Sequence, residues 1–81
     1  MKVPRDVSGD DLVKKLIKFE YKISRQKGSH IRLTTFQNGE HHVTIPNHPS
    51  LRVGTLSAIL SEVAIHHKKT KDEITQILFY E

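Results

Sequence analysis

The sequence predicts an α+β fold in which helices cover one face of a three-stranded antiparallel sheet. Apolar residues recur at helical spacing near the beginning and near the end of the chain. Between these regions, apolar and polar residues alternate as they do in half-buried strands. Turn sequences such as Asn38-Gly39 divide the alternating region into hairpins. Together these patterns predict the order α-β-β-β-α, followed by a short C-terminal helix.

The first helix is predicted at about Gly9–Phe19. Ser8 is a suitable N-cap because its hydroxyl can accept a hydrogen bond from a free backbone N–H. Asp10 and Asp11 follow, where the positive end of the helix dipole favours carboxylates. One side of this helix is apolar and another is rich in lysine. The apolar side comprises Leu12, Val13, Leu16 and Ile17, and the lysines are Lys14, Lys15 and Lys18.

Three strands are predicted next, at about Tyr21–Gln26, His30–Phe36 and His41–Ile45, with Pro46 ending the last. Side chains alternate between the faces of a sheet, so one face is expected to pack under helices and the other to meet solvent. The covered face comprises Tyr21, Ile23, Ile31, Leu33, Val43 and Ile45. The open face comprises Lys22, Ser24, Gln26, His30, Arg32, Thr34, Phe36, His42 and Thr44.

The second half of the chain predicts two helices after a proline-bounded loop at 46–50. The first is expected at about Val53–Val63, and the second over 70–80, because Thr70 and Glu73 have capping-box spacing. Their apolar stripes comprise Leu56, Ile59, Leu60 and Val63 in the first and Ile74, Ile77 and Leu78 in the second. We expect one domain, 1–81, with its core at about 7–65 and an extra helix at 70–80.

The composition narrows the class of protein. The formal net charge is +4 and the sequence pI is about 9.6, and basic surfaces attract phosphate backbones. The chain contains no cysteine, which excludes disulfide scaffolds and cysteine-based zinc sites. No stretch has the length of a signal-peptide core or the roughly 20 apolar residues of a membrane helix. We therefore expect a cytoplasmic protein that does not enter a membrane.

Candidate functional residues gather at the predicted turn between the first two strands, in the segment Arg25-Gln26-Lys27-Gly28-Ser29-His30. A glycine turn exposes backbone N–H groups, and here it lies beside two cations and a hydroxyl, an arrangement that can hold a phosphate. His30 opens the next strand on the open face. An imidazole beside a phosphate can move a proton to or from a ribose hydroxyl near neutral pH. The alternative is a surface hairpin with an ordinary exposed histidine.

Four motifs together resemble the HicA (YcfA-like) family of mRNA interferase toxins. They are Val7–Leu16 at the first helix, Gln26–His30 opening a strand, Ile45–His48 as a strand running into a Pro-x-His loop, and Gly54–Leu60 opening the second main helix. Each motif is short, but the four occur in the family's order and extend over about residues 7–63. The order and spacing make the resemblance specific.

The resemblance implies a double-stranded-RNA-binding-domain-like fold and ribosome-independent cleavage of mRNA. It also implies a type II toxin–antitoxin system, in which a HicB-type antitoxin neutralises the toxin. The family's catalytic histidine falls on His30, and its motif glycine falls on Gly28.

We therefore expect an endoribonuclease that needs no metal ion and no organic cofactor. His30 would transfer the proton, and Lys27 with the Gly28–Ser29 backbone would hold the scissile phosphate. Arg25 and Arg32 would hold neighbouring phosphates. Two alternatives use the same fold: a noncatalytic module that binds duplex RNA by its shape, and an inactive relic that only binds the antitoxin.

The other histidines have less specific interpretations. His41 and His42 are adjacent on a strand, so they point to opposite faces and do not easily share a metal ion. His48 either approaches RNA or caps the following helix. The basic run His66–Lys69 is interpreted as a solvated connection between helices.

The aromatic residues divide between the core and the open face. Phe19, Tyr21 and Phe79 are expected in the core. Phe36 is predicted on the open face, where it either stacks on a base or packs against the end of the hairpin.

Overall fold

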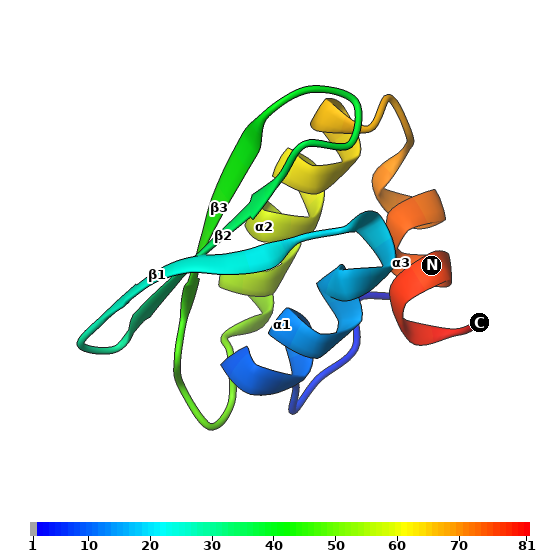
Figure 1. The fold of residues 1–81 in the computed structure, drawn as a ribbon. Helices are drawn as coiled ribbons and strands as arrows, with labels where there is room; N and C mark the ends of the chain where they lie inside the picture. The colour runs from blue at the N-terminus through cyan, green and yellow to red at the C-terminus, as the bar shows by residue number, and fades with distance from the viewer. Residues whose placement is uncertain (1) are drawn as a thin grey trace.

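The computed structural model describes residues 2–81 as a helix, three strands and two further helices (Figure 1). The elements are α1 (Gly9–Leu16), its short 3₁₀ continuation η1 (Ile17–Phe19), β1 (Lys22–Lys27), β2 (His30–Thr35), β3 (His41–Pro46), α2 (Val53–His66) and α3 (Lys71–Phe79). The strands form one antiparallel sheet in the order β1-β2-β3. Both α1 and α2 lie on one side of this sheet, and α3 packs beside them (Figure 1). The predicted α+β fold is therefore confirmed.

Helix α1 begins where its capping residues predict. The Ser8 hydroxyl accepts a hydrogen bond from the Asp11 N–H at 3.0 Å, and the Asp11 carboxylate accepts one from the Ser8 N–H at 3.3 Å. This reciprocal pair satisfies two backbone donors that the helix itself leaves free. Leu12 and Leu16 are fully buried and Val13 is half-buried, as the predicted apolar stripe requires. The prediction is wrong for Ile17, which is 62% exposed at the start of the 3₁₀ turn η1.

Helices α2 and α3 complete the covering layer. The predicted stripe of α2 is buried, and the helix extends three residues beyond Val63, to His66. Thr70 and Glu73 form the predicted capping box of α3. Ile74 and Leu78 of α3 are fully buried, so the last helix belongs to the core instead of lying on its surface. Within residues 2–81, no helix combines the length and the apolar character that crossing a membrane requires.

The sheet has the two faces that alternation predicts. Ile31 pairs with Ile45 and Leu33 with Val43, and these four side chains are at most 2% exposed beneath the helices. Ile23 pairs with Leu33 but is 54% exposed, which differs from its predicted burial. It belongs to the edge strand β1, all of whose residues are exposed. The buried side chains of the covered face therefore come from β2 and β3, and not from β1.

A β-bulge changes the alternation within β1. The register shifts between Ile23 and Arg25, so Arg25 lies opposite Arg32, and Lys27 opposite His30. Gln26 lies opposite the buried Ile31, and its predicted position on the open face is therefore wrong. A bulge adds one residue to a strand and reverses the face of everything that follows it. The extra residue places Arg25 and Lys27 on the open face, where strict alternation does not put them.

Candidate functional site

The turn between β1 and β2 presents the first part of the candidate site. Gly28 and Ser29 connect the two strands, and Gly28 adopts a φ of +57°, in the left-handed region. A Cβ at Gly28 would meet no atom within 4 Å, so backbone conformation, not crowding, favours glycine here. Both turn residues are exposed, which leaves this end of the hairpin accessible to a ligand.

Lys27 and His30 form the first row of side chains across the open face, with Pro46 completing it on β3. Directly paired residues of an antiparallel ladder have Cα atoms about 4.5 to 5.5 Å apart, and their side chains lie on the same face. Both side chains are exposed, and neither has a hydrogen-bond partner within the described chain. An ammonium group and an imidazole are thus adjacent and free to contact the same ligand.

Arg25 and Arg32 form the second row, with Thr44 beside Arg32 on β3. Two like charges directly opposite one another on a sheet destabilise it unless an anion lies between them. Both arginines are exposed, and no carboxylate among residues 2–81 pairs with either guanidinium. The pair is therefore suited to an anion that comes from outside the chain, such as a phosphate.

The loop after β3 is fixed beside the same turn. The Asn47 N–H donates to the Ser29 carbonyl at 2.6 Å, and the Gly9 N–H donates to the His48 carbonyl at 2.9 Å. A Cβ on Gly9 would overlap the Pro46 carbonyl oxygen, so only glycine permits this approach of α1 to the loop. These hydrogen bonds hold the predicted Pro-x-His loop next to the turn.

His48 does not cap the following helix, which was one of its two predicted roles. The N-cap of α2 is Arg52, and no side chain makes a capping hydrogen bond there. The His48 side chain is exposed in a loop whose backbone is bonded to the turn. Its alternative predicted role, an approach to RNA, is compatible with this position.

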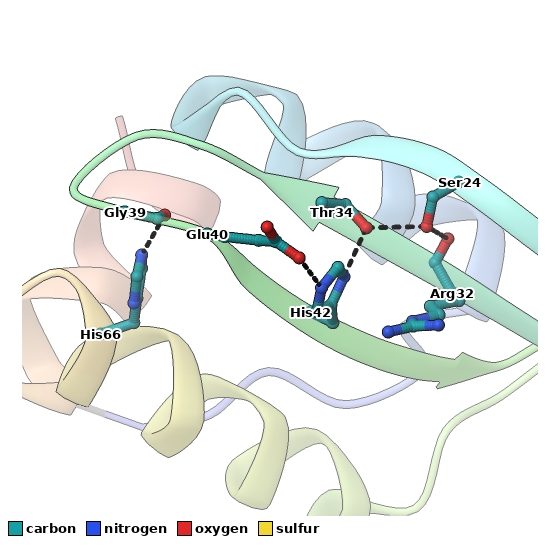
Figure 2. Close-up of polar contacts among 7 residues, drawn as sticks. All are labelled: Ser24, Arg32, Thr34, Gly39, Glu40, His42 and His66. Atoms are coloured by element: carbon teal, nitrogen blue, oxygen red, sulfur yellow. Dashed lines mark hydrogen bonds and ion pairs between the residues drawn. The ribbon is translucent and has the colours of Figure 1, made fainter.

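A chain of hydrogen bonds crosses the third row of the open face (Figure 2). The Ser24 hydroxyl donates to the Arg32 carbonyl at 3.2 Å, and the Thr34 hydroxyl donates to Ser24 Oγ at 2.7 Å. His42 Nδ1 lies 2.6 Å from Thr34 Oγ1, and His42 Nε2 lies 2.7 Å from a Glu40 carboxylate oxygen. These hydrogen bonds connect all three strands with the hairpin loop that carries Glu40.

These bonds hold His42 at both of its ring nitrogens. A carbonyl only accepts, so Ser24 uses its single hydrogen on Arg32, and Thr34 uses its own on Ser24. His42 lies between Thr34 Oγ1 at one ring nitrogen and the Glu40 carboxylate at the other. The third row of the open face is therefore a fixed hydrogen-bonded arrangement, and its imidazole is already engaged on both sides.

A second histidine cluster lies on the covered side of the sheet. The Tyr21 hydroxyl is 2.8 Å from His41 Nδ1 and 3.2 Å from His67 Nε2. Asn38 Nδ2 lies 3.2 Å from His67 Nδ1, and His66 Nε2 donates to the carbonyls of Gln37 and Gly39.

His67 is only 5% exposed. The prediction that the His66–Lys69 run is simply solvated is therefore wrong for its two histidines.

Burial controls the protonation of this cluster. Desolvation, followed by the neighbouring His66, lowers the pKa of both His41 and His67 below 6.5. Desolvation and the nearby Glu62 carboxylate raise the pKa of Tyr21 to about 12. The neutral rings form a consistent sequence, in which Asn38 donates to His67, His67 to Tyr21, and Tyr21 to His41. The cluster therefore joins the sheet to α2 through uncharged groups.

The position of His67 in the α2 repeat is the sequence signal for its burial. Leu60, Val63 and His67 follow helical spacing, so His67 continues the buried stripe by one further turn. The basic residues on either side hide this continuation. The histidines of the cluster do not form a metal site: within residues 2–81, no three His, Asp or Glu side chains are placed to hold a metal ion.

The predicted site residues form one continuous surface. The structure brings together Arg25, Lys27, Gly28, Ser29, His30 and Arg32 at the open face and the turn that ends it. The family model described as HicA toxin of bacterial toxin–antitoxin matches residues 9–65, more than half of the chain and inclusive of this surface. Comparison with curated proteins and with solved structures gave no match. The chain belongs to the HicA toxin family of bacterial toxin–antitoxin systems.

Proposed function

We propose that this toxin is an endoribonuclease that cleaves mRNA at the open face of its sheet, with His30 as the catalytic residue. The observation that carries the proposal is the direct pairing of Lys27 with His30, one row from the Arg25–Arg32 pair. A proton-transfer group and an ammonium group face the same space, and two unpaired guanidinium groups continue the positive surface. An RNA strand, which carries a negative charge at each phosphate, complements this positive surface better than an uncharged ligand does.

The proposed reaction uses the 2′-hydroxyl of the RNA as the nucleophile. His30 accepts the 2′-hydroxyl proton as that oxygen attacks the adjacent phosphorus. Lys27 and the backbone N–H groups of the Gly28–Ser29 turn stabilise the negative charge that develops on the phosphate. The bond from phosphorus to the 5′-oxygen breaks, and the leaving oxygen takes a proton from water, from His48 or from the newly protonated His30. The products are a 2′,3′-cyclic phosphate and a 5′-hydroxyl.

Purified toxin and a defined RNA test this mechanism directly. Incubation with and without EDTA, followed by mass spectrometry of the fragment ends, should give cyclic phosphate or 3′-phosphate ends in both conditions. A matched DNA strand, which has no 2′-hydroxyl, should stay intact. Cleavage that stops in EDTA, or ends bearing 3′-hydroxyl and 5′-phosphate, would contradict the mechanism but leave the family assignment unchanged.

His30→Ala tests the catalytic assignment. His30 is exposed and makes no internal hydrogen bond among residues 2–81, so its removal should change stability by no more than about 0.5 kcal/mol. Cleavage should disappear while the fold is kept. Lys15→Ala, which removes an exposed side chain of α1 that has no part in the proposed reaction, is the control for a surface substitution and should cleave as the parent does. A His30→Ala variant that cleaves at the parent rate would exclude His30 as the catalytic residue.

Membership in a toxin–antitoxin family implies an antitoxin partner. We propose that this partner is of the HicB type and that the toxin acts on mRNA in the cytoplasm. Because the open face is basic, an inhibitor that presents acidic groups there would compete directly with RNA.

A further inference from the structure

A hollow on the open face lies apart from the proposed catalytic row. It has a volume of about 640 Å³ and is lined by residues of all three strands and of the hairpin loop, among them Lys22, Thr34, Phe36, Gln37 and His42. Thr34 is four residues from His30 on β2, which is about 13 Å at the usual rise of a strand. The hollow is therefore a separate site on the same surface, reached from His30 across Arg32.

Two large apolar side chains line this hollow: Ile23, which is 54% exposed, and the aromatic Phe36, which is 74% exposed. The neighbours of Phe36 hold the loop firmly. The Thr35 hydroxyl donates to the Phe19 carbonyl at 2.8 Å and accepts from the Gln37 N–H at 3.1 Å. His66 donates to the Gln37 carbonyl at 2.9 Å from the side of α2. An aromatic ring is thus presented to solvent on a fixed backbone, where it loses little freedom when a flat ligand binds.

The charges around the hollow are balanced. Lys22 and Glu20 both line it, and His42 Nε2 lies 2.7 Å from a Glu40 carboxylate oxygen (Figure 2). The unpaired positive charges of Arg25 and Arg32 lie in the neighbouring row. Phosphate groups and acidic peptides are accordingly directed to that row, whereas the hollow suits an uncharged aromatic group with polar edges.

Gln37 lines the hollow, and its side-chain oxygen is not used by any other group among residues 2–81. Its side-chain oxygen is buried and accepts no hydrogen bond from residues 2–81. A buried acceptor without a partner destabilises a protein, so a ligand that donates to this oxygen adds stability. Because the oxygen accepts no hydrogen bond among residues 2–81, rotating the amide toward the hollow breaks none there. There the oxygen can accept from an amino group at the edge of a bound ring.

We infer that the Phe36 hollow binds one unpaired base of an RNA strand whose scissile phosphate lies at His30. This inference rests on the proposed function, because the strand reaches the hollow by continuing from His30 over Arg25 and Arg32. The base stacks on Phe36, and its edge faces Gln37 and the Thr34–His42 hydrogen bonds. Aromatic stacking accepts every base, so this subsite adds affinity for single-stranded RNA without strong sequence preference.

The test measures binding of a short single-stranded RNA by fluorescence anisotropy in the cleavage-deficient His30→Ala background. Phe36→Ala and Phe36→Leu should each weaken binding roughly 10-fold, since both remove the ring and Leu keeps apolar bulk. Phe36→Tyr should keep the affinity. Tyr80→Ala, which removes an exposed aromatic residue after α3 on the helical side, is the matched control and should bind as the parent does.

Abasic nucleotides locate the bound base. One abasic substitution, several nucleotides from the cleaved bond, should weaken binding to the parent and have no further effect in Phe36→Ala, as expected when both changes remove one interaction. Equal affinity of Phe36→Ala and the parent, or an abasic effect that persists in Phe36→Ala, would overturn the inference alone. A parent that neither binds nor cleaves RNA would overturn the proposed function as well. Loss of antitoxin affinity without loss of RNA affinity would assign the hollow to a protein partner instead.

Discussion

The imidazole rings of His41 and His66 are stacked, with centroids 4.3 Å apart and planes inclined by 9°. His41 belongs to β3 and His66 to the last turn of α2, so the contact joins the sheet to the helical layer. Two stacked imidazoles repel each other when both are protonated. Burial, and then His66, lowers the pKa of His41, which favours the neutral form of His41. The strength of this junction therefore depends on pH.

The free energy of unfolding should decrease as the pH falls below about 6.5. The pKa values of His41 and His67 are lowered from 6.5 in the folded protein. Between the lowered values and 6.5, the unfolded chain binds more protons than the folded one, so acid favours unfolding. Above this range both states are neutral, and the stabilisation is fully present. Urea denaturation on either side of pH 6.5 measures the change.

Two variants identify the source of that pH dependence. His67→Gln removes one buried titrating group and should flatten the dependence of stability on pH. His48→Gln changes an exposed loop histidine and should leave the dependence as in the parent. Parallel pH curves for the parent and His67→Gln would show that the cluster does not cause the effect.

Tyr21→Phe should destabilise the fold by about 1 to 3 kcal/mol. The substitution keeps the buried ring and removes only the hydroxyl, which is 3.2 Å from His67 Nε2 and 2.8 Å from His41 Nδ1. The buried His67 N–H then has no acceptor. Tyr80→Phe is the control, because Tyr80 is half-exposed and its hydroxyl makes one surface hydrogen bond. Equal unfolding midpoints for the two variants would contradict the proposed contribution of the cluster.

Gly28→Ala should reduce RNA cleavage strongly and stability only slightly. An alanine at a φ of +57° is strained by about 1 kcal/mol, and relief of that strain moves the turn N–H groups proposed to face the phosphate. Gly54→Ala provides the control, since Gly54 lies in the first turn of α2 with open space at its Cβ. That variant should be as stable as the parent or more stable. Full activity of Gly28→Ala would remove the turn from the mechanism.

RNA binding by the His30→Ala protein should weaken steeply with salt. Replacing Arg25, Lys27 or Arg32 by alanine should reduce the slope of log affinity against log salt by roughly 0.7 to 0.9 for each phosphate that the protein no longer neutralises. Lys15→Ala, which removes a charge from the exposed side of α1, should leave the slope unchanged. The same slope for all four variants would mean that the open-face cations do not bind phosphate.

The antitoxin should cover His30 or the Gly28 turn when it binds. Hydrogen–deuterium exchange of the toxin alone and in complex measures this, with protection expected over residues 25–32. The exposed residues of α3 serve as an internal reference on the opposite layer (Figure 1). Unchanged exchange at both His30 and Gly28 would indicate inhibition at a distance from the proposed site.

Local signals account for the parts of the fold that could be predicted. Ser8 with Asp11, and Thr70 with Glu73, form capping hydrogen bonds within four residues of chain, so sequence spacing alone locates two helix starts. Asn38 and Gly39 both adopt positive φ, as the hairpin signal requires. These features depend only on near neighbours, and the element boundaries agree with the prediction to within a few residues.

Long-range packing accounts for what could not be predicted. His67 is buried because Phe19, Tyr21 and Asn38 surround it, and they are 29 or more positions away in the chain. The two contacts of the His42 ring need Glu40 on the same hairpin and Thr34 on the neighbouring strand. Composition indicates that the region is basic, but only the folded sheet decides which histidines are buried among helices and which lie on the open face.

The bulge at Ser24 changes which residues of β1 point to each face of the sheet. Before the bulge, the side chains alternate between the two faces in the order that starts at Tyr21. After it, from Arg25 to Lys27, this order is shifted by one residue. Deleting Ser24 would remove the irregularity and leave Arg25 and Lys27 on their present face. Deleting Gln26 instead would allow a regular ladder in which Arg25 turns under the helices. The length of this strand, in addition to its composition, therefore determines which charges the toxin presents to its ligand.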